Sequence, residues 1–212
     1  DNQIMAASIL VPEAASITVI KDTVPNDAQD VAFSVTGTGL SPFTLDDDAD
    51  GTFANTQVFS GLAAGNYSVT ELAVAGFSLT SLSCEDPTSD SAVNAENATA
   101  TITLAAGEDV VCTFTNTKLP KLTVTKVVVN DDGGSMTVED FPLFVDDHSV
   151  TSGVEDAYAI GSYVVSEDGD ATYSAVISGD CAANGSVSLA AGDEKECVIT
   201  NLYKKPCYSS TA

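Results

Sequence analysis

The chain has 212 residues, of which 31 are acidic and 7 are basic, so its formal net charge at neutral pH is -24. All seven basic residues are lysines, and so acidic a chain repels nucleic-acid phosphates and anionic membranes. These features exclude nucleic-acid binding and any mechanism that needs an arginine clamp. The 44% hydrophobic and 18% charged content is that of a folded protein, not of a charge-rich disordered polymer.

The N-terminal residues 1–14 contain an apolar stretch, residues 4–11, that is far shorter than the roughly 20 residues of a membrane-spanning helix. We therefore expect no integral membrane segment. No basic signal-peptide region precedes the stretch, which predicts a mature or trimmed form. Such a segment is a candidate donor strand for the open sheet edge of a neighbouring copy, and the alternative is a frayed terminus or a strand packed on its own domain.

The rest of the chain alternates polar and apolar residues in short runs rich in Thr, Val and Ser, and Gly, Pro, Asn and Asp fill the gaps. This pattern predicts strands and turns and no amphipathic helix. The predicted strands cover residues 16–21, 31–35, 52–59, 66–71, 99–104, 110–116, 121–129, 162–167, 172–177, 186–189 and 196–201.

A repeat divides these strands into two sets. Residues 16–21 (SITVIK) correspond to 121–126 (KLTVTK), residues 65–71 (GNYSVTE) to 161–167 (GSYVVSE), and the Leu-Ala-Ala-Gly at 104–107 to that at 189–192. The order of landmarks is the same in both halves. We predict two domains, residues 15–118 and 119–205, and a tail, 206–212. Pro120 at the short junction restricts bending and predicts a rod.

The cysteines occupy equivalent places in the two halves. Cys84 and Cys112 lie in the first domain and Cys181 and Cys197 in the second, which predicts two intradomain disulfides. Zinc is the competing interpretation, but two cysteines per domain and one histidine in the chain do not fill tetrahedral sites. Paired cysteines indicate an oxidising compartment and export. Cys207 is unpaired or joins a second subunit.

Residues two apart on a strand share a face, so the landmarks can be assigned to the core. Each domain directs one lysine, one glutamate and one asparagine inward, and these are Lys21, Glu71 and Asn116, and Lys126, Glu167 and Asn201. A desolvated lysine is a nucleophile towards an asparagine carboxamide, and a buried, protonated glutamate can polarise the carbonyl group and move protons. Loss of ammonia would leave an isopeptide bond. The alternative is a lysine that extends outward to acidic neighbours.

The order of a lysine in the first strand, then Gly-x-Tyr-x-Val-x-Glu, then Thr-Asn in the last strand resembles the prealbumin-like (transthyretin-like, Cna-B type) domains of surface pilins and adhesin stalks. The resemblance covers residues 16–201 and occurs twice in register. It implies an all-β fold of two tandem prealbumin-like (inverse-Ig-like) β-sandwiches. In that family the Lys, Glu and Asn of this motif form an isopeptide crosslink, which supports the same role for the two sets above.

Two further patterns have a calcium or a glycan interpretation. Asp46, Asp48 and Asp50 open a D-x-D-x-D-G calcium loop, but Gln57 replaces the glutamate at position 12, and an acidic hairpin turn is the favoured interpretation. The glycosylation sequons begin at Asn66, Asn97 and Asn184, and Asn97 is the best candidate because its surroundings are loop-like.

The sequence as a whole predicts an extracellular structural protein at the cell surface. We expect it to be a filament, pilus or stalk subunit that assembles with other copies of itself. We expect no cofactor and no turnover catalysis, and at most a single autocatalytic crosslinking event. The alternative is an adhesin module that binds a glycan or a partner protein, although the chain has no tryptophan for an aromatic platform. A hydrolase ranks third, because the only histidine, His148, has no histidine partner.

Overall fold

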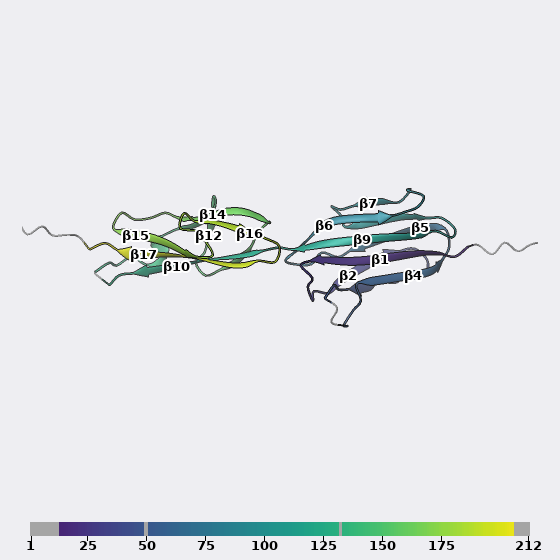
Figure 1. Ribbon diagram of the computed structural model, residues 1–212, viewed down its shortest axis with the longest axis horizontal. Helices are drawn as coiled ribbons and strands as arrows, with labels where there is room; N and C mark the ends of the chain where they lie inside the picture. The colour runs from purple at the N-terminus through teal and green to yellow at the C-terminus, as the bar shows by residue number, and fades with distance from the viewer. Residues whose placement is uncertain (1–12, 49–50, 132, 206–212) are drawn as a thin grey trace, which may run out of the picture. The chain divides into compact units, whose positions relative to one another are not determined.

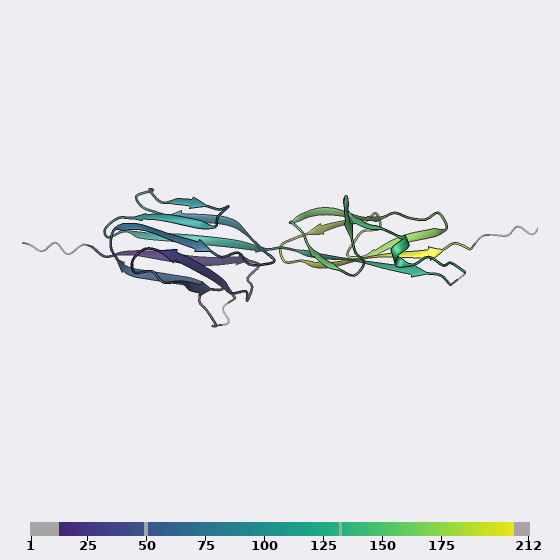
Figure 2. The same ribbon diagram turned by 180° about the vertical axis from the view of Figure 1, so that it is seen from behind.

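The computed structural model describes residues 13–48, 51–131 and 133–205. The candidate donor segment 4–11, Asp50 and Cys207 therefore lie outside the described residues. The chain separates into two compact units, Asp1–Lys118 (unit 1) and Leu119–Ala212 (unit 2). Nearly every regular element is a strand, and the one helical element of the described ranges is the 3-10 turn η1 (Val138–Asp140) (Figures 1 and 2). The all-β prediction is confirmed.

Unit 1 is a sandwich of two sheets. Its described strands are β1 (Ala15–Val24), β2 (Val31–Thr36), β3 (Phe43–Leu45), β4 (Thr56–Leu62), β5 (Gly65–Glu71), β6 (Phe77–Glu85), β7 (Ala92–Asn94), β8 (Thr99–Leu104) and β9 (Asp109–Lys118). One sheet has the order β4-β1-β9-β6 and the other β3-β2-β5-β8-β7. The first and last strands, β1 and β9, are parallel neighbours.

Unit 2 repeats this topology. Its described strands are β10 (Lys121–Val129), β11 (Leu143–Val145), β12 (His148–Val150), β13 (Glu155–Ala157), β14 (Gly161–Glu167), β15 (Tyr173–Gly179), β16 (Ser186–Leu189) and β17 (Glu194–Tyr203). The sheet orders β13-β10-β17-β15 and β12-β11-β14-β16 match those of unit 1 strand for strand, except that β7 has no counterpart. Strands β10 and β17 are again parallel neighbours.

Each core lies between the two sheets of its unit. In β1 every second residue from Ala15 to Thr23 is buried, as a strand with one face in the core requires. Phe33 stacks on Phe43 and meets Phe114 edge to face, with centroids 4.9 Å and 5.3 Å apart. The core of unit 2 is built mainly of aliphatic residues from the same strand positions. Alternating burial thus directs the odd-numbered residues of β1, Lys21 included, inward.

The sequence prediction missed the short strands β3, β7, β11, β12 and β13 and the edge strand β6. The five short strands have three residues each, which is too short for a period of two to be recognised. The strand predicted over residues 52–59 is wrong at its start, because β4 begins at Thr56. Among the described residues, no helix is long and apolar enough to cross a membrane.

Candidate functional site

Three polar side chains lie inside unit 1 where its two sheets meet. Lys21 on β1 is aligned with Phe114 of β9, and Asn116 lies two residues further along β9 on the same inward face. Glu71 ends β5 in the opposite sheet. The exposed fractions of Lys21, Glu71 and Asn116 are 0%, 5% and 3%. The parallel pairing of first and last strands thus places the lysine and the asparagine on neighbouring strands, and the second sheet supplies the carboxyl group.

The contacts in unit 1 pair the carboxyl group with the carboxamide. Asn116 donates a hydrogen bond from Nδ2 to Oε1 of Glu71 over 2.5 Å. The Lys21 Nζ donates to the main-chain oxygens of Asp22, at 2.6 Å, and Phe114, at 3.1 Å. The Glu71 Oε2 and the Asn116 Oδ1 are buried and have no hydrogen-bond partner among the described residues. Such unpaired buried oxygens are costly and are typical of groups with a chemical task.

Burial shifts both titrating groups of this site towards their neutral forms. It lowers the pKa of the Lys21 ammonium, although the nearby charges of Glu71, Asp22 and Asp47 oppose the shift. It raises the pKa of the Glu71 carboxyl, against the hydrogen bond from Asn116 and the charge of Lys21. A neutral amine and a protonated carboxyl are the forms that nucleophilic attack on an amide requires.

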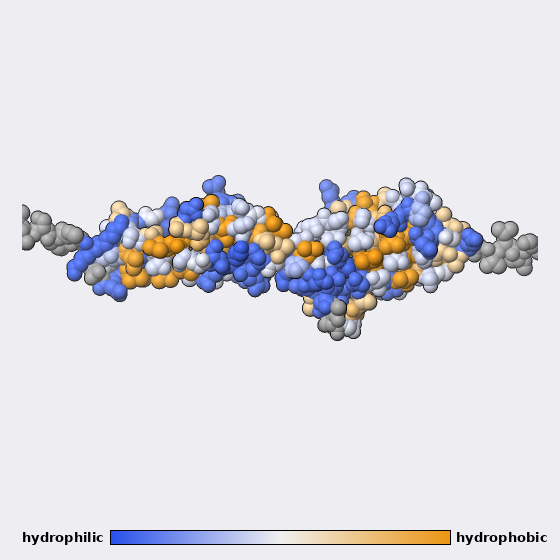
Figure 3. Space-filling model, in the orientation of Figure 1, coloured by the Kyte–Doolittle hydropathy of each residue, from blue (hydrophilic) through white to orange (hydrophobic). Residues whose placement is uncertain are grey.

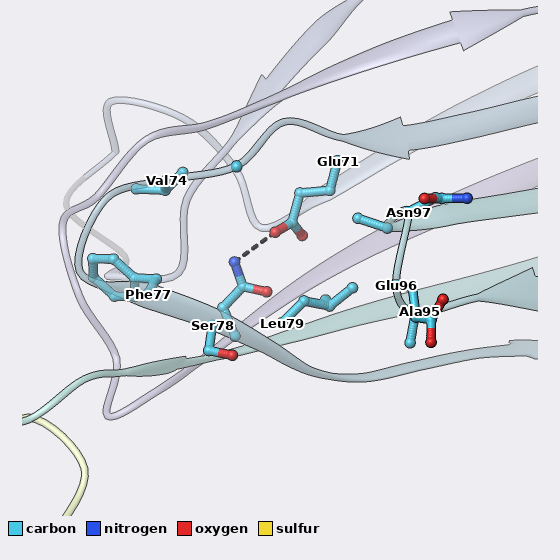
Figure 4. A pocket seen from close by; sticks show the side chains of 11 residues that line it. Glu71, Val74, Phe77, Ser78, Leu79, Ala95, Glu96 and Asn97 are labelled. Carbon is cyan, nitrogen blue, oxygen red and sulfur yellow. Dashed lines mark hydrogen bonds between the residues drawn. The ribbon is translucent and has the colours of Figure 1, made fainter. Parts of the chain in front are cut away.

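A cavity of about 410 Å³ opens onto the Glu71–Asn116 pair. Figure 4 shows the hydrogen bond at the Glu71 carboxyl group, with Phe77 to its left, Leu79 below it and Asn97 to its right. The cavity therefore reaches two members of the buried set, Glu71 and Asn116. This opening could not be predicted from the sequence, because its walls come from residues 71–79, residues 95–98 and Asn116, which are far apart in the chain.

Unit 2 assembles the same residue types with a different pairing. Lys126 on β10 and Asn201 on β17 face inward, and their exposed fractions are 5% and 1%. Glu167, at the end of β14, forms an ion pair and hydrogen bond with the Lys126 Nζ, and the exposed fraction of its side chain is 8%. In the part of the chain that the structure describes, the Asn201 Oδ1 and the Glu167 Oε1 are buried and have no hydrogen-bond partner. Burial lowers the pKa of Lys126, and the contact with Glu167 opposes that shift.

The repeated topology agrees with comparisons to known families. Residues 17–118 match a model described as a prealbumin-like fold domain, and residues 118–199 match a second model with the same description. The chain belongs to the prealbumin-like domains. It carries two of them in tandem, which we call prealbumin-like domains 1 and 2, and neither model describes an enzyme.

Solved structures that are similar to this chain include the TIE protein of Bacillus anthracis, a streptococcal ancillary pilin and a major pilin of Streptococcus pyogenes. Their sequence identities to the chain are 16%, 15% and 16%, and the TM-scores are 0.39, 0.35 and 0.28. The matches cover 90%, 91% and 92% of this chain, and 34%, 63% and 98% of the other chains. The chain thus spans less than two thirds of the first two proteins. No curated protein matches its sequence.

Both prealbumin-like domains contain the predicted disulfide. Cys84 and Cys112 are bonded and lie opposite each other on β6 and β9. Cys181, just beyond β15, is bonded to Cys197 on β17. The first disulfide therefore connects the last strand of its domain to the neighbouring edge strand. The second connects the last strand to the residues that directly follow the neighbouring edge strand.

The remaining predicted sites lie away from the buried triads. Asn66 lies in β5, Asn97 in the turn before β8 and Asn184 in the turn before β16, and all three are exposed. Asp46 and Asp48 lie between β3 and β4, so two strands rather than the two helices of a calcium loop flank them. No three His, Cys, Asp or Glu side chains of the described ranges are grouped as metal ligands. His148 is exposed at the start of β12.

Sequence reasoning missed several contacts made by Lys126 and by the strands that carry the two glutamates. The Lys126 Nζ lies 4.7 Å from the ring centroid of Phe141, a cation–π contact. The tyrosines of the two Gly-x-Tyr motifs, Tyr67 and Tyr163, each donate a 2.8 Å hydrogen bond to the main-chain oxygen four residues earlier. The ring of Tyr67 also lies against Gly37, where an added Cβ would be 2.2 Å from a ring carbon. The repeat itself marked the tyrosines, but not what they contact.

Proposed function

We propose that this chain is an extracellular structural protein, a subunit of a cell-surface filament or stalk, whose two domains are each tied by a disulfide and by an isopeptide bond. The observation that carries the proposal is the burial of a lysine, a glutamate and an asparagine together in both domains. A fold that only needed stability would gain little from such a set, because an unpaired buried polar atom costs about 1–3 kcal/mol. Reaction of the lysine with the asparagine replaces an ionisable buried amine with a neutral amide, which removes the cost of burying a charge there.

In domain 1 the neutral Lys21 amine attacks the Cγ of Asn116. The protonated Glu71 polarises the carbonyl oxygen, and protons from the amine pass through its carboxyl group to Nδ2, to which Oε1 is already hydrogen-bonded. The new Nζ–Cγ bond forms, the Cγ–Nδ2 bond breaks and ammonia leaves, with no oxidant and no water consumed. Lys126, Glu167 and Asn201 have the corresponding roles in domain 2. Each set reacts once, on its own chain.

The crosslink would join β1 to β9 and β10 to β17, which are the first and last strands of their domains. A covalent bond between neighbouring parallel strands prevents them from separating when the chain is pulled or attacked by proteases. Disulfides require an oxidising compartment, which agrees with a cell-surface location. The acidic surface keeps such a polymer soluble.

The intact mass, measured without reducing agent, tests the crosslinks. Each isopeptide bond lowers the mass by about 17 Da and each disulfide by about 2 Da. We expect a total deficit of about 38 Da, with crosslinked peptides that join Lys21 to Asn116 and Lys126 to Asn201. A deficit of about 4 Da would contradict the crosslinks and leave the disulfides as the only covalent reinforcement.

We further propose that copies of the chain assemble through the apolar segment 4–11, which adds as a strand to an open sheet edge of a neighbouring copy. Strands β6 and β15 are at sheet edges and are long enough to accept it, with nine and seven residues. Light scattering over a concentration series should show assembly of the full chain and none of a form without residues 1–11. Equal assembly of both forms would contradict strand donation without bearing on the crosslinks.

A further inference from the structure

The connection between β3 and β4 holds a buried carboxyl group that the crosslinking chemistry does not use. Asp46 directly follows β3, and its exposed fraction is only 2%. Its Oδ2 accepts a 3.2 Å hydrogen bond from the main-chain nitrogen of Phe53. Its Oδ1 is buried and has no hydrogen-bond partner within residues 13–48, 51–131 and 133–205. A buried carboxyl oxygen without a partner is costly, so a further group is needed to complete its surroundings.

Asp46 lines a cavity of about 330 Å³. Asp47 and Asn26 also line it, and no lysine does. The Asp47 Oδ2 accepts a 2.9 Å hydrogen bond from the main-chain nitrogen of Thr23, and its main-chain oxygen accepts one from Asn26 Nδ2. Figure 3 shows hydrophilic residues gathered on the lower side of unit 1, where this connection lies in Figure 1. The cavity thus combines two carboxyl groups, and no lysine of the described residues lines it, although the charge of Asp47 also acts on the buried Lys21.

We propose that this cavity binds a divalent cation of the calcium type, with Asp46 Oδ1 as the anchoring ligand. Oxygen atoms of Asp47 and Asn26 and water complete the coordination. Calcium accepts six to eight oxygen ligands in irregular geometry, whereas magnesium demands a near-ideal octahedron, so calcium suits an arrangement with few carboxylates. Because no third acidic side chain of the described residues joins the site, the affinity falls in the weak range of extracellular modules, a Kd of about 10⁻⁴–10⁻³ M.

This site differs from the loop that the D-x-D-x-D-G motif predicts. The motif draws its ligands from alternate positions of one loop, including Asp50, which lies outside the described residues. The cavity instead joins Asp46 and Asp47 to Asn26 of the β1–β2 connection. The observation that identifies it is the unpartnered Oδ1, which the sequence could not reveal.

A calcium titration of the isotope-labelled full chain, followed by amide NMR at constant ionic strength, tests the proposal. The amide signals of Phe53 and Thr23, which donate to the two carboxyl groups, should shift saturably. Asp46→Asn should weaken binding at least about tenfold, since even outer-sphere partners of metal ligands cost that much. Asp131→Asn is the matched control, because it removes one exposed acid from a turn of domain 2 and should leave the Kd unchanged.

Diffuse counterion binding to this acidic chain would look different. Shifts that do not saturate, that spread over all acidic turns and that persist in the Asp46→Asn variant would overturn the proposal. Mn²⁺, which shares the preference for oxygen ligands, gives a readout that needs no variant. It should broaden the amide signals around Asp46 before those around Asp131, and equal broadening at both places would also overturn the proposal.

Discussion

Asn116 donates its Nδ2 hydrogen bond to Glu71 in domain 1, whereas in domain 2 the equivalent glutamate, Glu167, is paired with Lys126. The same three residue types on equivalent strands thus have two arrangements. In the first, the carboxyl group lies beside the leaving nitrogen of the carboxamide. In the second, it lies beside the nucleophile. In the proposed reaction, a carboxyl group that transfers protons must contact both the amine and the leaving nitrogen. Domain 1 shows the contact with the leaving nitrogen, and domain 2 shows the contact with the amine.

Replacing Glu71 with glutamine should prevent the crosslink of domain 1 and leave that of domain 2 intact. Glutamine has nearly the shape of glutamate and keeps an oxygen for the hydrogen bond from Asn116, but it has no carboxyl proton to transfer. The mass deficit from ammonia should fall from about 34 Da to about 17 Da. Glu96→Gln is the matched control, because Glu96 is an exposed glutamate on the wall of the same cavity. Full crosslinking in Glu71→Gln would remove Glu71 from the mechanism.

The rate of crosslinking should have a plateau between two pH limits. In the reactive state of domain 1, the Lys21 amine is neutral and the Glu71 carboxyl group is protonated. Burial raises the pKa of Glu71 above 4.5 and lowers that of Lys21 below 10.5, so the two pH limits lie closer together than they would for exposed groups. Below the Glu71 pKa both groups are protonated and the amine is charged. Above the Lys21 pKa both are deprotonated and the carboxyl group has no proton to give.

The pH profile can be measured by refolding chain that was denatured before it could react, and following the mass loss with time at each pH. We expect the rate to fall at both extremes. A rate that rose continuously with pH beyond 10.5 would show that only the amine matters and that the Glu71 proton has no role.

Much of this architecture could be predicted from the sequence, because period-two burial is a local property of a strand. That period alone indicated that Lys21 and Asn116 face inward, and the repeat indicated the same for Lys126 and Asn201. The pairing of Glu167 with Lys126, and of Glu71 with Asn116, could not be predicted. It depends on how two sheets approach each other, and the two domains differ in this although their motifs are the same.

Contacts made by irregular segments were also beyond the sequence. Phe141 covers Lys126 from the segment that links η1 to β11, and nothing in the spacing of the two residues indicates their contact. The unpartnered Asp46 lies in a turn whose aspartates look alike in the sequence, and only burial distinguishes it from its neighbours. Repeats and strand periods predict which residues face the core, but they do not predict which contacts the irregular segments make with those residues.

Tyr67→Phe should destabilise domain 1 by about 1 kcal/mol, the usual net value of one hydrogen bond. The hydroxyl group donates to the main-chain oxygen of Ala63, and the ring keeps its contact with Gly37. Denaturant unfolding of a form that cannot crosslink, Asn116→Ala, provides the measurement. Tyr163→Phe should affect domain 2 in the same way through Ala159. No loss of stability in either variant would mean that water replaces the bond without cost.

The Cys84–Cys112 disulfide should determine the free energy of local opening of β6. This strand is at the edge of its sheet and has only β9 as a sheet neighbour, whereas β1 lies between β4 and β9. The disulfide joins directly opposed residues of β6 and β9, so its loss frees an edge strand that the proposed Lys21–Asn116 bond does not reach. Replacing both cysteines with alanine removes about 3 kcal/mol of constraint, which corresponds to roughly a hundredfold in an opening equilibrium.

Hydrogen exchange of the β6 amides measures this opening directly. In the crosslinked protein they should exchange up to about a hundredfold faster in the Cys84→Ala, Cys112→Ala variant, while the amides of β1 keep their protection. The matched control is the Cys181→Ala, Cys197→Ala variant, which should loosen β15 and leave β6 unchanged. Parallel loss of protection in β1 and β6 would mean that the domain opens as a whole, and that no bond between β1 and β9 holds its centre together.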